Sequence, residues 1–322
     1  MHILILSRKA TIYSTRRLTE AAKARGHEVT IVDPLEISLV VSRGRPSLYL
    51  RGAEVSGFDL VIPRIGASVT NYGLAVVRQF DMMGVAVLNH AVAIARSRDK
   101  LRAMQLLTRK DLDLPTTVCT KTSAHIDAAL ALVGGPPAIV KLHQGTQGIG
   151  VMLCETRQAV ESTLEAFWTL GQDIILQEFV AESRGRDIRA IVVGGRVVAA
   201  MRRRAQKGEF RSNLHRGAEA EALTNIDPRY ARAAVEACKV MALEVAGVDM
   251  LETRSGPRIL EINSSPGLEG IEKSTTVDVA MAVIRHGERY VKRRKRGRGA
   301  FPGAAERAID DERVLRRRRT AR

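Results

Sequence analysis

The sequence predicts a mixed α/β protein in which an N-terminal parallel sheet is followed by α+β lobes. Strand and helix signals alternate from residue 1 to about residue 95, a pattern typical of a parallel sheet covered by helices. Beyond that point, apolar runs separated by glycine turns predict antiparallel hairpins between amphipathic helices. A chain of 322 residues with 45% hydrophobic and 27% charged residues is long enough for two or three globular domains.

Composition excludes several classes of protein. No apolar run reaches the length of about 18 residues that a membrane span needs. The start, MHILILSRKA, is too short in its apolar part for a signal peptide and is typical of a first strand. Cys119, Cys154 and Cys238 stand far apart without a CxxC pair, which indicates reduced cysteines of a cytoplasmic protein.

The net charge of +16 is unevenly distributed. Residues 291–322 contain 13 Lys and Arg against 4 Asp and Glu, a balance of +9, which leaves +7 for the first 290 residues. Because this C-terminal stretch is poor in apolar residues, we expect a disordered basic tail with at most a short helix near 304–315. Such a tail is either a solvated chain end or a contact to the phosphates of RNA.

The N-terminal region contains no dinucleotide fingerprint, because the first strand is followed by SRKATIYS and not by GxGxxG. Arg64 stands at the end of a later strand, where it either faces a ligand in an interdomain cleft or forms a surface ion pair. The elements that we expect here are strands at His2–Leu6, Glu28–Val32, Leu60–Ile65 and Val85–Leu88, and helices at Thr15–Arg25 and Leu74–Met83.

A basic amphipathic helix is predicted at Arg96–Arg109, with Lys100 near its start. On its own, Lys100 is typical of a solvated helix lysine. The elements expected next are strands at Thr116–Thr120, Ala138–Leu142, Val151–Cys154 and Ile174–Val180, and helices at Ala124–Val133 and Arg157–Leu170.

A glycine-rich hairpin tip, HQGTQGIG, follows the strand that carries Lys141. The backbone N–H groups around Gly145, Gly148 and Gly150 can cradle phosphate oxygens. The loop is neither a Walker loop nor a Rossmann turn, since a strand follows where a helix is required. This arrangement favours a flap over a triphosphate, and the alternative is a hairpin without a ligand. The edge of the strand that ends at Glu178 can offer backbone groups to a purine.

The C-terminal region predicts a hairpin that turns at Gly194-Gly195 and places Asp187 and Arg189 on one face. The arginines and lysines that follow, from Arg202 to Arg216, are either solvated or hold anions. The expected helices are Pro228–Val245 and, at the end, Glu272–Arg289.

A second hairpin, 246–263, carries the candidate metal ligands. Strand alternation places Glu261 and Asn263 on one face and Leu260 and Ile262 on the other, and Asp249 on the partner strand reaches the polar face if the register allows. Oxygen ligands of this kind suit Mg²⁺. The alternative is that the two carboxylates form ordinary ion pairs with arginines.

The motifs ARSRDK, IVKLHQGTQGIG, LQEFV, RDIR, FRSNLHRG, GVDML and LEINSSPGLEGIEK together resemble the ATP-grasp superfamily and, within it, the RimK family of ligases. The resemblance covers residues 1 to about 290 and leaves the tail outside. It implies an ATP-grasp fold with two lobes that clasp ATP. The implied parts are a pre-ATP-grasp α/β domain (1–95), a central lobe with the flap (96–185), a C-terminal lobe with the metal site (186–290) and the basic tail (291–322).

The resemblance also implies roles for single residues. Lys100 and Lys141 would bind the nucleotide phosphates, Glu178 and Phe179 would line the adenine pocket, and Asp187 would contact the nucleotide. Phe179 stands where the family can have a tyrosine, a change that keeps the apolar ring face. The further implied roles are phosphate and substrate contacts for Arg211, Ser212 and Asn213, and coordination of two Mg²⁺ or Mn²⁺ ions by Asp249, Glu261 and Asn263, with Glu261 bridging.

Ligases of the RimK family add glutamate to the C-terminus of small-subunit ribosomal protein six, and the resemblance implies this reaction and a tetramer here. Arg189, Arg203 and Arg216 are our candidates for holding substrate carboxylates and the tetrahedral oxyanion. One alternative is a related ATP-grasp ligase that acts on a small molecule or a carrier protein. Another is an RNA- or ribosome-binding protein with a vestigial nucleotide site.

Overall fold

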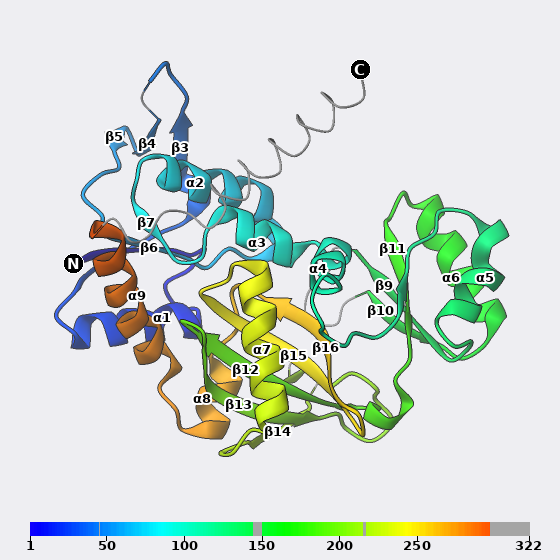
Figure 1. Cartoon of the computed structure of the whole chain (residues 1–322). Helices are drawn as coiled ribbons and strands as arrows, with labels where there is room; N and C mark the ends of the chain where they lie inside the picture. Colours follow the sequence, from blue (N-terminus) through cyan, green and yellow to red (C-terminus); the bar gives the residue numbers. More distant parts are fainter. Residues whose placement is uncertain (45, 144–149, 215–216, 297–322) are drawn as a thin grey trace, which may run out of the picture.

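The computed structural model describes residues 1–44, 46–143, 150–214 and 217–296. Within these ranges the chain forms a parallel N-terminal sheet with a small antiparallel sheet beside it, a central lobe and a larger C-terminal lobe (Figure 1). The predicted division into a parallel region and an antiparallel region is confirmed. No described helix is long and apolar enough to cross a membrane.

The N-terminal sheet has the strand order β2-β1-β6-β7, and all of its pairings are parallel. Its central strand β1 is a continuous apolar run, buried on both faces, because helices cover both sides of the sheet. The small sheet β3-β4-β5 was not predicted. The elements are β1 (His2–Leu6), α1 (Tyr13–Ala24), β2 (Glu28–Val32), β3 (Ile37–Val40), β4 (Ser47–Leu50), β5 (Ala53–Glu54), β6 (Leu60–Pro63), α2 (Thr70–Met82) and β7 (Ala86–Val87).

The single helix predicted at Arg96–Arg109 is wrong, because the structure has two helices there, α3 (Ala91–Arg98) and α4 (Lys100–Leu107). Asp99 between them is extended, and its carboxylate accepts a hydrogen bond from the N–H of Arg102. An aspartate in this role starts a new helix. The break places Lys100 at the first position of α4.

The central lobe is an antiparallel sheet with the order β10-β9-β11-β8, and it stands apart on the right of Figure 1. Helices α5 and α6 pack on the sheet through a core that includes Val140, Val160 and Leu176. The elements are β8 (Thr117–Val118), α5 (Ile126–Leu132), β9 (Ala138–Leu142), β10 (Val151–Cys154), α6 (Arg157–Thr169) and β11 (Ile174–Glu178).

The C-terminal lobe is an antiparallel sheet with the order β14-β13-β12-β15-β16. Alternation along β12 decides how it is covered: Ala190 and Val192 pack in the same core as α7, whereas Ile191 and Val193 pack in the core that contains α8 and α9. The elements are β12 (Arg186–Val193), β13 (Arg196–Arg204), β14 (Glu219–Ala222), α7 (Pro228–Met241), β15 (Val245–Thr253), β16 (Gly256–Asn263), α8 (Glu269–Thr275) and α9 (Val279–Lys295).

Two predicted helices of this lobe have different bounds in the structure. Helix α7 ends at Met241 because Ala242 takes a left-handed conformation with φ of 56°. The predicted helix Glu272–Arg289 is wrong as one element: α8 ends where Thr276 is left-handed, and the Asp278 carboxylate then caps α9. The tail was predicted to start at residue 291, but residues 291–295 belong to α9. The short helix predicted near 304–315 lies outside the described residues.

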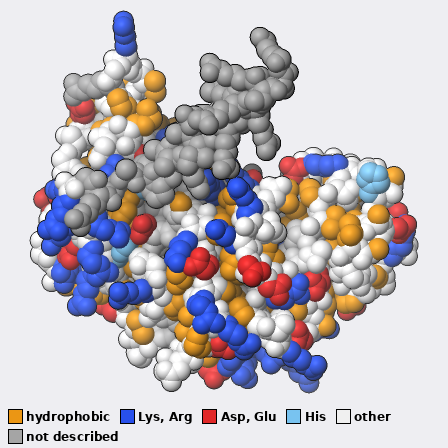
Figure 2. All heavy atoms as spheres, viewed as in Figure 1, with side chains coloured by type: hydrophobic (Ala, Val, Ile, Leu, Met, Phe, Trp, Pro, Cys, Tyr) orange, Lys and Arg blue, Asp and Glu red, His pale blue; other side chains and the backbone are white. Residues whose placement is uncertain are grey.

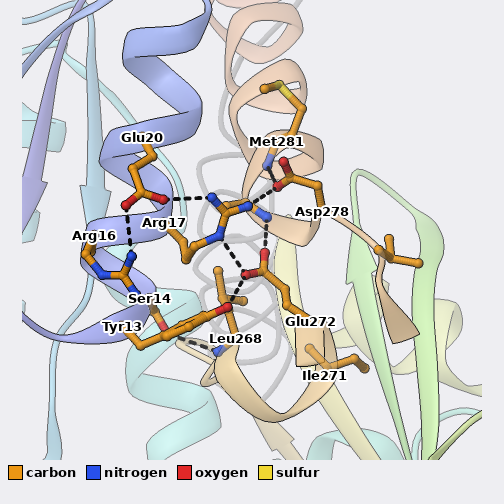
Figure 3. A network of polar contacts seen from close by, with 12 residues as sticks. Tyr13, Ser14, Arg16, Arg17, Glu20, Leu268, Ile271, Glu272, Asp278 and Met281 are labelled. Atoms are coloured by element: carbon orange, nitrogen blue, oxygen red, sulfur yellow. Dashed lines mark hydrogen bonds and ion pairs between the residues drawn. The ribbon is translucent and has the colours of Figure 1, made fainter. Parts of the chain in front are cut away.

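A buried carboxylate joins the N-terminal domain to the C-terminal lobe. Glu272 on α8 accepts hydrogen bonds from the Tyr13 hydroxyl at 3.1 Å and from Arg17 Nε at 3.0 Å, both on α1, and also from the backbone N–H of Ala280 (Figure 3). Below it, the Leu268 N–H donates to Ser14 Oγ. Because α1 also packs against α9, these two parts of the chain share one core.

Candidate functional site

A cleft of about 1050 Å³, open solvent included, lies between the central lobe and the C-terminal lobe. Its walls come from β9 and β11 on one side and from β12, β15 and β16 on the other. Its size and mixed polar and apolar lining are typical of a small-molecule site. The predicted site residues that line it are Lys100, Lys141, Glu178, Phe179, Asp187, Arg203, Arg211, Ser212, Asn213, Asp249 and Glu261.

Other predicted residues are placed less directly. Arg189 and Asn263 do not line the cleft. Arg189 forms an ion pair with the lining residue Asp249, and Asn263 stands two residues after the lining residue Glu261 on β16. Gly150 stands at the start of β10. Gly145, Gly148 and Arg216 lie outside the described residues.

The register of the β15–β16 hairpin places Asp249 opposite Glu261, and Gly247 opposite Asn263. The condition set by the sequence, that Asp249 reach the polar face, is therefore met. Gly247, opposite Asn263, leaves room for the Pro266 ring, because a Cβ at residue 247 would lie 3.0 Å from the Cβ of Pro266.

The predicted placement of Leu260 on the core face is wrong. The register shifts beside Met250, which pairs with Ile259, so that Leu260 becomes the extra residue of a β-bulge. The bulge allows Ile259 and Ile262 both to enter the core, while Leu260 and Glu261 both line the cleft. Strict alternation cannot produce this arrangement, and bulges of this kind commonly re-aim side chains beside sites.

Asp249 is held in a buried network of arginines. Arg189 donates to it through Nε at 2.7 Å and Nη2 at 2.6 Å, and Arg203 Nη2 lies 3.0 Å from it. Arg203 also forms a two-bonded pair with Asp187. Burial raises the pKa of the Asp249 carboxyl, but the charges of Arg189 and Arg203 outweigh it and hold the pKa at about 2.

At Asp187 the balance is reversed, because burial raises the pKa more than the charge of Arg203 lowers it. The ion-pair alternative that the sequence left open therefore describes Asp249 in this state of the protein. It does not describe Glu261, which has no ion pair among the described residues.

The donor set fits a magnesium ion in its chemistry. Asp249, Glu261 and Asn263 offer only oxygen ligands, and Glu261 is a partly buried carboxylate in the cleft with no guanidinium bound to it. Within the described ranges no group of three or more His, Cys, Asp and Glu is placed to hold a metal, so Asn263 and bound phosphates have to complete the site. An ion at Asp249 has to displace arginine donors from at least one carboxylate oxygen.

Two lysines approach Glu261 from other elements. Lys141 on β9 is buried, donates to Gln177 Oε1 at 2.5 Å, and feels the charges of both Glu261 and Lys100. Burial, with a further contribution from Lys100, lowers the pKa of Lys141 to about 8 although Glu261 opposes the shift. The pKa of Lys100 is lowered by burial in the same way. Two desolvated ammonium groups in one cleft favour the binding of an anion between them.

Gly150 directly precedes β10, at the end of the glycine-rich segment between β9 and β10. Its carbonyl accepts the N–H of Leu142, its φ is 73°, and a Cβ would lie 2.5 Å from the Leu142 side chain. Only glycine fits here without strain.

The cleft also has apolar lining residues, among them Phe179, that suit a flat ring. Phe179 lies beneath the guanidinium of Arg184, 5.9 Å from the ring centroid. The Glu178 carboxylate does not point freely into the cleft, since Arg258 binds it with two bonds of 2.6 and 2.8 Å. Its backbone is thereby fixed at the cleft. The apolar lining residues are Met104, Ile139, Val151, Ile175, Phe210, Leu251 and Leu260.

Sequence reasoning missed three residues with clear contacts at this site. Gln177 holds Lys141, Arg258 holds Glu178, and Glu209 binds Arg211 through two bonds of 3.0 and 2.8 Å. Gln177 carried a signal that was overlooked, because a polar residue inside the apolar run Ile174–Leu176 needs a polar partner. Glu209 and Arg211 stand two residues apart, so this pair could have been considered from the sequence, whereas Arg258 and Glu178 are 80 residues apart and carry no local signal.

Comparison with known proteins shows which family the chain resembles. Two family models match the chain: the RimK PreATP-grasp domain over residues 1–94 and the RimK-like ATP-grasp domain over residues 97–286. A protein of Shewanella frigidimarina named probable alpha-L-glutamate ligase 1 is 54% identical, with coverage of 91% of this chain and 97% of that protein. A probable alpha-L-glutamate ligase of Thioalkalivibrio sulfidiphilus is 53% identical, with coverage of 93% and 100%.

Among solved structures, the ATP-grasp ligase PsnB complexed with a phosphomimetic variant of its minimal precursor, Mg and ADP has a TM-score of 0.68. The likeness covers 90% of this chain and 98% of that one at 21% identity, and it shows the shared fold.

Proposed function

The chain belongs to the RimK-like ATP-grasp family, and on this premise we propose that it is an ATP-dependent ligase that joins L-glutamate to a carboxylate acceptor. We propose further that the acceptor is the C-terminus of small-subunit ribosomal protein six. The observation that carries the proposal is the convergence of desolvated Lys141 with Asp249 and Glu261 in one cleft. That cleft combines cations for phosphate with carboxylates for a divalent ion.

The reaction must bring together two anions, ATP and the acceptor carboxylate. An acceptor carboxylate oxygen attacks the γ-phosphorus, the bond to the β,γ-bridging oxygen breaks, and ADP leaves with that oxygen. The glutamate amine then attacks the acyl phosphate, loses a proton, and releases inorganic phosphate as the amide bond forms. When bound, two Mg²⁺ or Mn²⁺ ions supply positive charge that offsets the phosphate charge.

The chain's own residues fit this sequence of events. Lys100 and Lys141 would bind the phosphates, and the backbone at Glu178 and the ring of Phe179 would hold the adenine. Asp187, through Arg203, fixes the position of Asp249. Arg189 and Arg203 remain candidates for the tetrahedral oxyanion, because an ion at Asp249 would free some of their donors. Arg216 keeps its proposed substrate role from the sequence alone.

Three further residues and the glycine-rich hairpin complete the proposed site. Arg211, Ser212 and Asn213 would contact phosphate and substrate. The hairpin that contains Gly145, Gly148 and Gly150 would exclude water from the acyl phosphate.

The test is incubation of the protein with ATP, Mg²⁺, isotope-labelled L-glutamate and ribosomal protein six, followed by mass spectrometry. We expect mass increments of one or more glutamyl residues on the acceptor's C-terminal peptide and one ADP for each. ADP formation with a small molecule or a carrier protein, but not with ribosomal protein six, would move the proposal to the related ligases. No ADP with any acceptor, together with RNA binding that survives Glu261→Ala, would indicate a vestigial site.

A ribosomal RNA contact through the C-terminal basic residues is also proposed. Figure 2 shows basic side chains gathered over α1 and α9, and exposed α9 residues include Arg285, Arg289 and Lys292. Removal of residues 297–322 should then weaken ribosome binding and reduce its salt dependence. Salt-insensitive affinity that is equal with and without these residues contradicts the contact.

The proposed tetramer is checked by light scattering.

A further inference from the structure

Two arginines beside the cleft have no carboxylate partner in the part of the chain that the structure describes. Arg64 donates through Nη2 to the carbonyl of Pro266 at 2.8 Å, and Arg98 donates to the carbonyl of Ile65. The Nε of Arg98 is buried without any hydrogen-bond partner among the described residues. Since each guanidinium has five N–H donors, most N–H groups of Arg64 and Arg98 make no hydrogen bond to the residues that the structure describes. The surface ion pair considered for Arg64 is not formed.

The position of Arg64 is one where parallel sheets bind ligands. Strands β1 and β6 are neighbours in the order β2-β1-β6-β7. The chain passes from β1 outward to β2 on one side and from β6 outward to β7 on the other. The helices α1 and α2 pack in different cores. Ligands bind at the carboxyl ends of the strands at such a point. Arg64 directly follows β6 at that end.

A second, smaller cavity of about 320 Å³, open solvent included, lies at this point, and Arg64, Asn89 and Ser264 contribute its polar lining. Asn89 has all its amide groups engaged with the backbone of Glu244, Val245 and Ser264. The Ser264 hydroxyl is buried and has no hydrogen-bond partner among the described residues. The polar groups of this cavity with unused hydrogen-bonding capacity are therefore a guanidinium and a hydroxyl.

The cavity is adjacent to the reaction site. Ser264 follows Asn263 at the end of β16, whereas Glu261, three residues earlier, lines the large cleft. Residues at the end of β16 and directly after it therefore line both cavities.

The local charge favours an anion. Burial lowers the pKa of Arg64 to about 10, with a contribution from the charge of Arg98. Burial also lowers the pKa values of Arg98 and Lys100, against the opposing charge of Glu261. The charge of Glu261 thus acts on three of the cations, Arg98, Lys100 and Lys141, whereas no carboxylate acts on Arg64. Lys100 and Lys141 line the nucleotide cleft, but Arg64 and Arg98 do not, so they are placed for an anion other than the triphosphate.

We propose that Arg64 and Arg98, with the Ser264 hydroxyl, bind a carboxylate group of a substrate, either of L-glutamate or of the acceptor chain. A guanidinium fork matches a carboxylate with two parallel hydrogen bonds. The inference rests on the proposed function, because it assigns a second site to a substrate of that reaction.

The test measures binding by calorimetry in the presence of Mg²⁺ and a non-hydrolysable ATP analogue. One arm titrates L-glutamate and the other titrates a peptide with the C-terminal sequence of the acceptor. We expect Arg64→Gln to weaken one arm about 10- to 100-fold, as for the loss of a charge-assisted pair, while the affinity for the nucleotide analogue changes less than about threefold. The arm that weakens identifies the carboxylate.

Arg294→Gln is the matched control. Arg294 also donates to a backbone carbonyl across the domain contact, that of Val85 at 2.8 Å, but Val85 precedes β7 and so lies at the opposite, amino end of the parallel strands. It should leave both arms unchanged. Arg64→Lys and Arg98→Gln test the same site if Arg64→Gln does not fold, and either should weaken the same arm.

Several outcomes overturn the inference. Wild-type affinity of Arg64→Gln and Arg98→Gln in both arms refutes it, and so does an equal loss of nucleotide affinity. Equal effects of Arg294→Gln would show that only domain packing is involved. If the wild-type protein binds nucleotide but neither substrate, the proposed function itself fails, and the inference with it.

Discussion

Replacement of Lys141 by methionine tests whether the cleft holds a desolvated cation. Lys141 is 9% exposed, and its pKa in the folded protein is about 8. In the unfolded chain a lysine titrates near the usual value of about 10.4. Between these two values the unfolded state binds more protons than the folded state, so the stability contributed by this group rises with pH.

The size of the effect follows from the two pKa values. Between pH 6.5 and pH 9.5, relief of the burial penalty should stabilise the wild-type protein by about 2 kcal/mol, whereas Lys141→Met gains nothing from this source. The methionine variant also leaves Gln177 Oε1 without its donor, but that cost does not depend on pH. The difference in unfolding free energy between the two proteins therefore isolates the lysine.

The assay is urea unfolding of both proteins at the two pH values. We expect the stability of the variant relative to wild type to fall by about 2 kcal/mol from pH 6.5 to pH 9.5. Lys23→Met, on the exposed face of α1, is the control and should show a far smaller change. A difference that stays constant with pH would refute a desolvated lysine at this site. The variant should also lose most nucleotide affinity.

Three further predictions concern the metal ligands, the flap and the domain contact. Asp249→Asn should lose the gain in ADP affinity that Mg²⁺ gives and also destabilise the fold by about 3 kcal/mol, because Arg189 and Arg203 lose a buried partner. Glu261→Gln should lose the same Mg²⁺ effect with little change in unfolding free energy, and equal destabilisation by both variants would contradict a separate role for Glu261. Gly150→Ala should cost more stability than Gly171→Ala. Both positions have positive φ, with the usual cost of about 1 kcal/mol, but only Gly150 would place its Cβ against Leu142, so equal melting temperatures would be evidence against that contact. Glu272→Gln should lower the unfolding free energy by about 2 kcal/mol, whereas Glu20→Gln, which removes an exposed partner of the same Arg17, should lower it far less. Similar losses for these two would show that burial of Glu272 does not matter.

The elements that the sequence predicted well are those with a strong local pattern. β1, β2 and β9 match their predicted bounds, because each is a short apolar run between turn residues. The breaks at Asp99 and Thr276 were missed, since both lie inside stretches with helical periodicity and a single cap residue outweighs that periodicity. The bulge at Leu260 was missed because it satisfies a core that the local sequence does not describe.

The sequence by itself determined which chemical groups are candidates for the site: the two lysines and the two carboxylates, which line the cleft, and the Asn263 amide, which does not. Only the tertiary structure decided how these groups are partnered. It places Arg189 and Arg203 on Asp249, Arg258 on Glu178, and leaves Glu261 and Arg64 without an opposite charge of their own among the described residues. The physical reason is that a side chain's identity is local, whereas its desolvation and its partner depend on strands up to 80 residues apart in the chain, as for Glu178 and Arg258.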